Sequence, residues 1–192
     1  WRARMDRMAD WFIAGEVRRA TSARVLTLEG SGAAVVDPLA FTLTVKADRI
    51  DATEDGQLII YDYKTGSPPT EREMRYYKRQ LLVEAVMAEH GAFEDIAPTS
   101  VARVDHIGLN RALKQTGTDL AIVKVPKSGE IDYRTATIET ELKQLLEHFH
   151  QESKGYMPRR AMERLRFSGD FDQLARFGEW DETQEPVVVP LK

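Results

Sequence analysis

The sequence from residue 45 to residue 66 reads VKADRIDATEDGQLIIYDYKTG, which is two strand-like runs separated by an acidic turn. The second run, residues 58–64, is β-branched and aromatic and is soon followed by Gly66, a pattern typical of a β-strand. The Glu-Asp-Gly turn at residues 54–56 favours pairing with the run before it. We therefore predict a β-hairpin here.

Two carboxylates and an amine lie on this hairpin. Side chains alternate along a strand, so Asp62 and Lys64 project from one face, while Tyr61 and Tyr63 point to the other. The same alternation places Asp48 on the polar face of the first run. If the two runs pair, Asp48 approaches Asp62 across the hairpin.

These residue types suit a divalent metal. Mg²⁺ usually takes one or two carboxylates and keeps its other positions for water and phosphate oxygens, and Asp48 with Asp62 supplies that minimum. Such an ion makes water a better nucleophile, and Lys64 could orient the water or stabilise charge on a phosphate. From these residues alone, a surface hairpin with ordinary salt bridges is the more economical interpretation.

A helix is expected from Thr70 to about Gly91. Thr70 and Glu73 match a capping box, and Gly91 is a typical residue at a helix end. A polar stripe along this helix would consist of Tyr76, Gln80 and Glu84. Gln80 could then face the pair of aspartates.

DNA contact would have to use local basic patches, because the net charge of the chain is −4. The candidates at the start of the expected helix are Arg75, Tyr76, Lys78 and Arg79. A solvated helix face with intrahelical ion pairs is the alternative. A second basic stretch, residues 154–166, is equally open between DNA contact and a solvated or covered segment.

Three motifs resemble the RecB-like branch of the PD-(D/E)XK nucleases, and in particular the C-terminal nuclease domain of AddB-type subunits. ADRID at residues 47–51 is similar to the first acidic motif of that family, and IIYDYKTG at 59–66 to its Asp-x-Lys core. QLLVEA at 80–85 is similar to the glutamine motif, and GDFDQLARFGEW at 169–180 to the end of alphaproteobacterial-type AddB chains. The resemblance covers nearly the whole chain.

The resemblance implies a role for each matching residue. Mg²⁺ would be bound by Asp48, Asp62 and the backbone carbonyl of Tyr63, and Mn²⁺ could substitute for it. Lys64 would assist the attacking water, and Gln80 would position substrate or the lysine. Many relatives have Gln-x-x-x-Tyr, whereas Glu84 stands at the tyrosine position here, so that role does not transfer. Some relatives hold an iron–sulphur cluster with cysteines, and this chain has none, so no such cluster is expected.

A third carboxylate is a candidate from the first helix. Its expected apolar face consists of Met5, Met8, Ala9, Phe12, Ile13, Val17 and Ala20. Glu16 lies within that face, where a carboxylate is costly to bury without a cation, and the fold family often takes a glutamate from this helix into its site. Glu16 is therefore a candidate metal ligand, and an ion pair with Arg19 or Arg24 is the alternative.

The expected fold class is α/β, a PD-(D/E)XK restriction-endonuclease-like core with a mixed central β-sheet flanked by α-helices. Further strands are expected at residues 101–109 and 120–125 and a helix at about 137–151. Residues 1–192 would form a single domain with a loose tail at about 181–192. Because the chain starts at Trp1 inside a helical pattern, we expect a fragment of a larger subunit.

The implied function is a Mg²⁺-dependent exonuclease acting on single-stranded DNA within an AddAB- or RecBCD-like helicase-nuclease, in double-strand break repair by recombination. Its partners would be DNA and an AddA-type helicase-nuclease subunit. The sequence contains no apolar run of membrane-spanning length and no signal-peptide pattern, so no membrane association and a cytoplasmic location are expected. The alternatives are a stand-alone RecB- or Cas4-like exonuclease and a catalytically silent DNA-binding or scaffold module.

Overall fold

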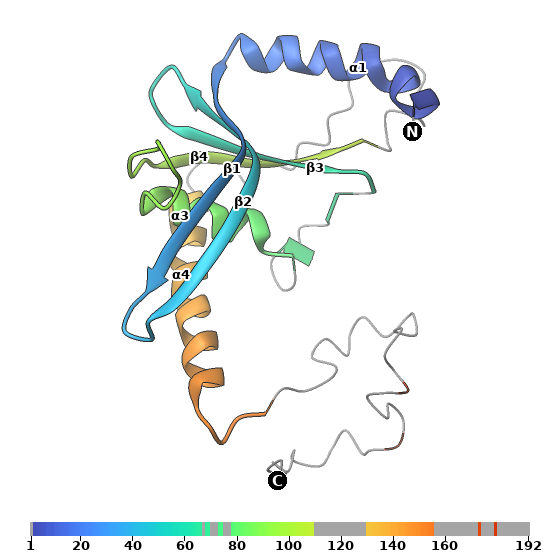
Figure 1. Ribbon diagram of the computed structural model, residues 1–192. Coiled ribbons are helices and arrows are strands. Elements are labelled where there is room, and N and C mark those ends of the chain that lie inside the picture. The colour runs from blue at the N-terminus through green and yellow to red at the C-terminus, as the bar shows by residue number, and fades with distance from the viewer. Residues whose placement is uncertain are drawn as a thin grey trace. The chain divides into compact units, whose positions relative to one another are not determined.

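The computed structural model describes residues 2–66, 68–69, 73–74, 78–109, 130–155, 173 and 179. The elements in chain order are α1 (Arg2–Ala20), β1 (Ala23–Val36), β2 (Phe41–Thr53), β3 (Leu58–Lys64), α3 (Gln80–Glu89), β4 (Val101–Gly108) and α4 (Glu130–His150) (Figure 1). The chain divides into two compact units, residues 1–142 and 143–192. The sheet, α1 and α3 all belong to the first unit.

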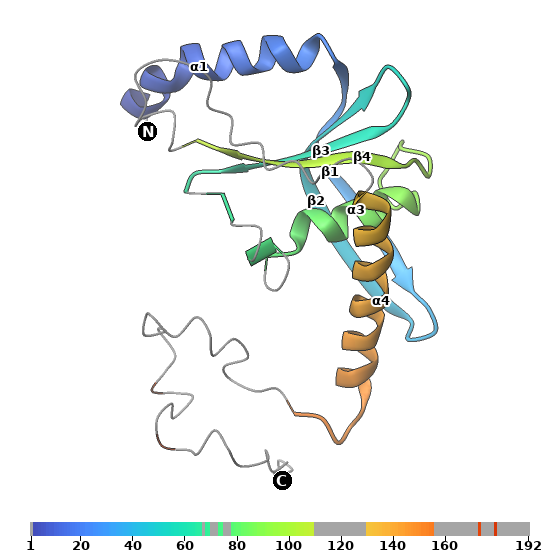
Figure 2. The same cartoon turned by 180° about the vertical axis from the view of Figure 1, so that it is seen from behind.

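The four strands form one sheet in the order β1-β2-β3-β4. β1 pairs antiparallel with β2, β2 pairs antiparallel with β3, and β3 pairs parallel with β4. α1 lies on one side of β3 and β4 and α3 on the other, as the two opposite views in Figures 1 and 2 show. The expected α/β class with a mixed, helix-flanked sheet is confirmed.

The β2–β3 hairpin has the predicted register. Its ladder runs from Arg49 opposite Tyr61 to Ala52 opposite Leu58. The turn closes where the amide of Thr53 donates to the carbonyl of Gln57 at 2.8 Å, and Gly56 has a φ of +79°, which glycine adopts without steric cost. The sequence therefore places Asp48 one step beyond the last pair of the ladder, opposite Asp62.

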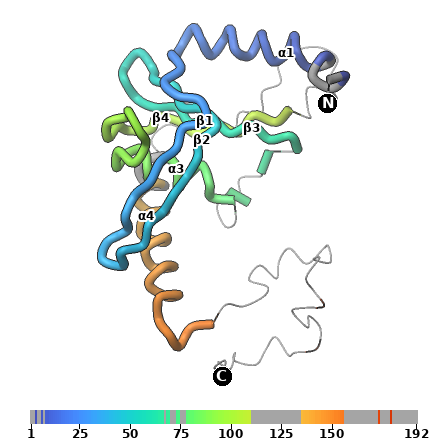
Figure 3. Tube along the Cα trace, viewed as in Figure 1, coloured from blue at the N-terminus to red at the C-terminus, as the bar shows by residue number. Residues whose placement is uncertain are grey.

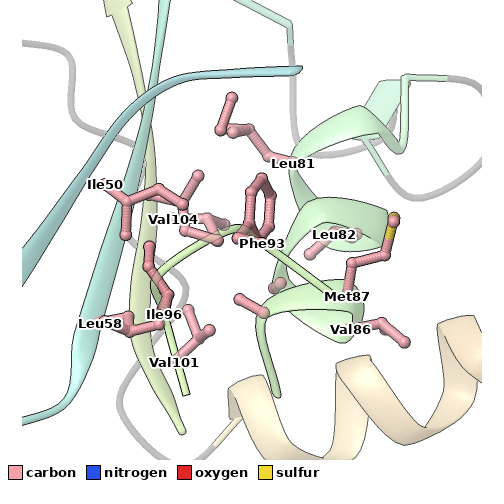
Figure 4. Packing of buried hydrophobic residues seen from close by; sticks show 14 of the residues in the cluster. Ile50, Leu58, Leu81, Leu82, Val86, Met87, Phe93, Ile96, Val101 and Val104 are labelled. Carbon is pink, nitrogen blue, oxygen red and sulfur yellow. The ribbon is translucent and has the colours of Figure 1, made fainter. Parts of the chain in front are cut away.

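Apolar side chains cover both faces of the sheet. The larger cluster joins the strands to α3, and Figure 4 shows Leu81 of the helix and Phe93 beside the strands that carry Ile50 and Val104. The smaller cluster contains Ile59, Tyr61 and Ile107, against which Trp11 of α1 packs. A core on each face fixes the sheet between two helices, because buried apolar area is the main stabilising contribution.

Two helices differ from the sequence-based expectation. The expected helix is not continuous, because Glu73 and Met74 are helical, Lys78 and Arg79 are not, and α3 begins at Gln80 (Figure 3). Thr70, where the helix was expected to begin, lies outside the described residues. The amide of Lys78 donates to the carbonyl of Glu73 at 2.7 Å, a bond five residues back that does not continue an α-helix. α4 begins at Glu130, earlier than expected. Strand β4 confirms the strand expected at 101–109.

The face of α1 that meets the sheet also differs. Ile13 and Val17 are 57% and 60% exposed, so they do not belong to the packed face. Met8 is buried, and the ring of Phe12 lies tilted by 49° against that of Tyr63 of β3, with 5.9 Å between the centroids. The packed face follows the four-residue spacing of Met8, Phe12 and Glu16. The row of α1 side chains that faces the sheet therefore includes a charged residue.

The expected strand at 120–125 lies outside the described residues, as do the basic stretch from 156 onward and the tail at 181–192. Among the helices that the structure describes, none combines the length and apolar character needed to cross a membrane.

Candidate active site

Asp62 lies on β3 with 3% of its surface exposed. One carboxylate oxygen, Oδ1, accepts a hydrogen bond from Lys64 Nζ at 2.7 Å, and the other, Oδ2, is 3.1 Å from His106 Nδ1 on β4. Burial alone would raise the pKa of Asp62, but the hydrogen bonds from His106 and Lys64 outweigh it and lower the pKa below its ordinary value. Asp62 is therefore held as an anion inside the domain.

Asp48 lies on β2 at the end of the hairpin ladder. Its Oδ2 accepts a hydrogen bond from the backbone amide of Tyr63 at 2.8 Å. This bond continues the β2–β3 pairing through a side chain, because the ladder itself ends at Arg49 and Tyr61. The structure thus brings Asp48 beside the backbone that joins Asp62 to Lys64.

α3 contributes Gln80 and Glu84 near the same two aspartates. Gln80 Nε2 donates to Glu84 Oε1 at 2.9 Å, while Oε2 of Glu84 is buried and has no partner among the described residues. Burial, together with the negative charges of Asp62 and Asp48, raises the pKa of Glu84 to about 7 in spite of the bond from Gln80. The glutamate therefore lies within electrostatic reach of the aspartate pair.

The donor groups fit a hard divalent ion. Asp48 and Asp62 offer two carboxylates, and the carbonyl of Tyr63 lies on the backbone between Asp62 and Lys64. Among the described residues, no group of three or more Asp, Glu, His or Cys side chains is arranged to hold a metal. Mg²⁺ needs only one or two carboxylates when water and phosphate fill its other positions, so this set suffices.

The protein-family model of the PD-(D/E)XK nuclease superfamily matches residues 1–173. The chain belongs to this superfamily. Its members are generally nucleases that act on DNA and use divalent metal ions, which agrees with two aspartates and a lysine at the end of a central hairpin. A comparison with curated proteins finds no match.

In this PD-(D/E)XK chain, Glu16 is engaged by arginines. Arg19 donates to its Oε1 at 2.5 Å, and Arg49 donates to its Oε2. The hydroxyl of Tyr63 lies 3.4 Å from Oε1. Burial would raise the pKa of Glu16, but the two arginines lower it overall. The structure thus shows the ion pair with Arg19 that the sequence offered as the alternative to metal binding, whereas Arg24 takes no part in these bonds.

Arg49 is the member of this cluster that sequence reasoning missed. It is 4% exposed, and its guanidinium donates two bonds to Asp51, at 2.6 and 2.7 Å. It also lies over the ring of Tyr61, 5.2 Å from the centroid. An arginine inside a strand of otherwise buried residues is the signal that could have indicated a buried ion pair, but its partner on α1 is 33 residues away in the sequence.

The candidate DNA contacts are only partly described. Arg75 and Tyr76 lie outside the described residues. Lys78 forms an ion pair with Glu73 at 3.5 Å, and Arg79 bonds Glu141 of α4. Both described cations are thus paired within the protein, and their contact with DNA stays a prediction.

His106 is a second residue that the sequence did not reveal. It is 3% exposed and lies directly beside Asp62 in the parallel β3–β4 pair. Sequence alternation could assign it to one face of a strand, but the register of a parallel pair depends on the connection between its strands. That connection holds 36 residues, residues 65–100, between Lys64 and Val101.

Proposed function

We propose that this chain is a Mg²⁺-dependent deoxyribonuclease domain that hydrolyses phosphodiester bonds of single-stranded DNA. Its setting would be an AddAB- or RecBCD-like helicase-nuclease that processes double-strand breaks for recombination. The observation that carries the nuclease activity is the position of Asp48, held by the amide of Tyr63, beside Asp62 and Lys64. Mn²⁺ would substitute for Mg²⁺, because it also takes oxygen ligands in octahedral geometry.

Each residue of the site has a distinct task in this proposal. Asp48, Asp62 and the carbonyl of Tyr63 hold the ion, which when bound supplies an activated water and offsets charge on the phosphate. The ammonium of Lys64 is 2.7 Å from Asp62 and so lies where it can orient the water or stabilise a phosphate oxygen in the transition state. The two aspartates are held before substrate arrives, which lowers the cost of assembling the site.

Gln80 would act from the helix that covers this side of the sheet. Its amide oxygen can accept a hydrogen bond while its Nε2 donates to Glu84, so Gln80 can position substrate or Lys64. Glu84 replaces the tyrosine of many relatives, and we assign it no part of that role. We propose that Glu16 anchors α1 through Arg19 and Arg49 instead of binding the metal. It lies on the side of the sheet that carries the Tyr63 ring, 3.4 Å from the Tyr63 hydroxyl, whereas Asp62 projects from the opposite face.

The proposals of a single-stranded substrate and of an AddA-type partner subunit rest on the motif resemblance. ADRID, IIYDYKTG and QLLVEA, at residues 47–51, 59–66 and 80–85, follow one another in the order of the family motifs that they resemble. A partner helicase would deliver the strand, and the resemblance includes no motor motif in this chain.

The test is degradation of end-labelled single-stranded DNA with Mg²⁺ or Mn²⁺, compared with an equal length of duplex. The variants are Asp62→Ala and Lys64→Ala. Asp55→Ala is the matched control, because Asp55 is an exposed carboxylate in the turn of the same hairpin. We expect metal-dependent cleavage that both site variants lose and the control retains.

Metal binding by the unaltered chain, measured by calorimetry, decides the case in which no cleavage occurs. Binding that is lost in Asp62→Ala would place the requirement on a missing partner subunit, and addition of the partner should then restore cleavage. Absence of both binding and cleavage would contradict the proposal and favour a silent DNA-binding or scaffold module.

A further inference from the structure

We propose that His106 is a positioning residue of the metal site, which fixes the carboxylate of Asp62 through a hydrogen bond from its Nδ1–H. This inference rests on the proposed metal-dependent function and adds to it a residue from the neighbouring strand. His106 touches neither substrate nor ion in this proposal and acts through Asp62 alone.

The register of the sheet creates this contact. Asp62 and His106 are Cα partners in the parallel pair of β3 and β4. Both side chains are buried, with 4% and 3% of their surfaces exposed. The distance from Nδ1 to Oδ2 is 3.1 Å. Two adjacent strands therefore present an acid and an imidazole to each other in a buried environment.

The chemistry of the two groups determines which ring nitrogen of His106 carries a hydrogen. An ionised carboxylate only accepts hydrogen bonds, so the ring nitrogen that faces Asp62 must carry a hydrogen. Asp62 also accepts a hydrogen bond from the ammonium of Lys64 at 2.7 Å, and this contact favours the ionised carboxylate. The imidazole must then have its proton on Nδ1, whatever the state of Nε2.

Each of the two donors to Asp62 bonds a different carboxylate oxygen. Lys64 binds Oδ1 and His106 binds Oδ2. The terminal torsion of an aspartate is otherwise broad, so two fixed donors select one orientation of the carboxylate. Each oxygen still has a lone pair for a cation. Donors of this kind behind a metal ligand commonly change metal affinity 10- to 100-fold.

A residue that only filled space in the core would not need the hydrogen bond that His106 makes to Asp62. Its Nε2 is buried and lacks a partner among the described residues, so the bond to Asp62 is the polar contact that orients the ring in this part of the chain. Burying a histidine with one unsatisfied nitrogen is costly. An apolar residue of similar size would avoid that cost but would leave Asp62 with a single donor.

Three variants separate positioning from packing. His106→Asn keeps an N–H donor near the place of Nδ1, His106→Gln moves the donor to the place of Nε2, and His106→Leu removes it. We expect Mn²⁺ affinity, measured by calorimetry, to fall about 10- to 100-fold in the Leu and Gln variants and to recover to within about threefold of the unaltered chain in His106→Asn. Melting in EDTA reports stability separately and should not follow this order.

The catalytic readout follows the same pattern. With saturating metal and single-stranded DNA, kcat should fall in His106→Leu and return in His106→Asn, while KM for DNA changes little. Equal Mn²⁺ affinity in the unaltered chain and a folded His106→Leu would overturn this inference and leave the proposed function intact. Absence of Mn²⁺ binding by the unaltered chain would overturn the proposed metal site and this inference with it.

The unaltered chain offers a test that needs no variant to fold. The chain has four histidines, so the ring nitrogens of His106 can be assigned by nitrogen-15 NMR from the signal that disappears in His106→Asn or, if no variant folds, from backbone assignment. We expect the metal-free protein to show a protonated Nδ1. A ring protonated on Nε2 alone would overturn the inference, because Nδ1 could then donate nothing to Asp62.

Discussion

The backbone amide of Tyr63 donates a hydrogen bond to Oδ2 of Asp48 at 2.8 Å. The β2–β3 ladder ends one step earlier, at Arg49 and Tyr61, so a side chain of β2 takes the place of the next backbone acceptor. This single bond fixes the first aspartate relative to the backbone that carries the second. Asp48 therefore has a structural task that can be separated from its charge.

Asp48→Asn and Asp48→Ala should separate these tasks. Asparagine keeps an oxygen that can accept from Tyr63, so in EDTA this variant should have a melting temperature close to that of the unaltered chain. Because it loses the negative charge, it should bind Mn²⁺ at least about 10-fold more weakly. Alanine loses both, and it should also be less stable by about 1 kcal/mol for the lost hydrogen bond. Calorimetry and melting measure the two effects. Full Mn²⁺ affinity in Asp48→Asn would contradict the assignment of Asp48 as a ligand.

Glu84→Gln should change how stability depends on pH. The pKa of Glu84 is raised from about 4.5 to about 7, so between these values the folded chain binds more protons than the unfolded chain. Stability conferred by this group is therefore complete below about pH 4.5, falls as the pH rises to about 7, and is constant above. Between about pH 4.5 and pH 7, the free energy of unfolding of the unaltered chain should therefore fall by about 3 kcal/mol relative to that of Glu84→Gln.

Denaturant unfolding in EDTA at several pH values measures this difference. Asp105, whose buried carboxyl has a pKa raised to about 6, titrates in both proteins, so its contribution cancels in the comparison. Glu89→Gln is the control, because Glu89 lies on the same helix and is only partly buried. Parallel stability curves for the unaltered chain and Glu84→Gln would show that Glu84 is not held in its neutral form.

Arg49→Met should destabilise the domain strongly. Asp51 is fully buried and takes two hydrogen bonds from Arg49, so removal of the arginine leaves an uncompensated buried charge, at a cost of about 3–5 kcal/mol. Lys46→Met is the matched control on the same strand. Its ion pair with Glu29 is exposed and should contribute less than about 1 kcal/mol. Equal losses in the two variants would contradict the view that Arg49 holds a buried network.

The hairpin was predictable because its determinants are local. Alternation between residues 58 and 64 and the glycine of the turn fix both the strand and its partner, and the register that brings Asp48 to Asp62 follows from them. The helix start was not predictable in the same way. Thr70 and Glu73 match a capping pattern, but the amide of Lys78 bonds the carbonyl of Glu73, five residues back, and Lys78 and Arg79 are not helical. No local propensity specifies this interruption before Gln80.

The remaining partners of the site depend on long-range packing. His106 meets Asp62 only because β4 joins β3 in parallel with a particular register, and Glu16 meets Arg49 only because α1 packs on the face opposite α3. These contacts join residues that are far apart in the sequence, so composition and periodicity do not predict them. Sequence reasoning placed Glu16 on a packed helix face, but it assigned Ile13 and Val17 to the same face, and both are exposed.

Glu16→Gln should lower stability without weakening metal binding. The carboxylate accepts from Arg19 and Arg49, and loss of its charge should cost about 1–2 kcal/mol near neutral pH. The pKa of Glu16 is lowered in the folded chain, so its stabilising effect is present above its unfolded pKa and is lost as the pH falls through the folded value. The stability difference between the two proteins should therefore shrink in acid.

The control is Glu29→Gln, which removes the carboxylate of an exposed ion pair with Lys46 and should change neither melting nor metal affinity appreciably. Calorimetry with Mn²⁺ then distinguishes the two tasks open to Glu16. An affinity equal to that of the unaltered chain, together with reduced stability, is expected for an anchor of α1. An affinity reduced about 10-fold or more with unchanged stability would instead make Glu16 a ligand, which would require Arg19 and Arg49 to release it when the ion binds.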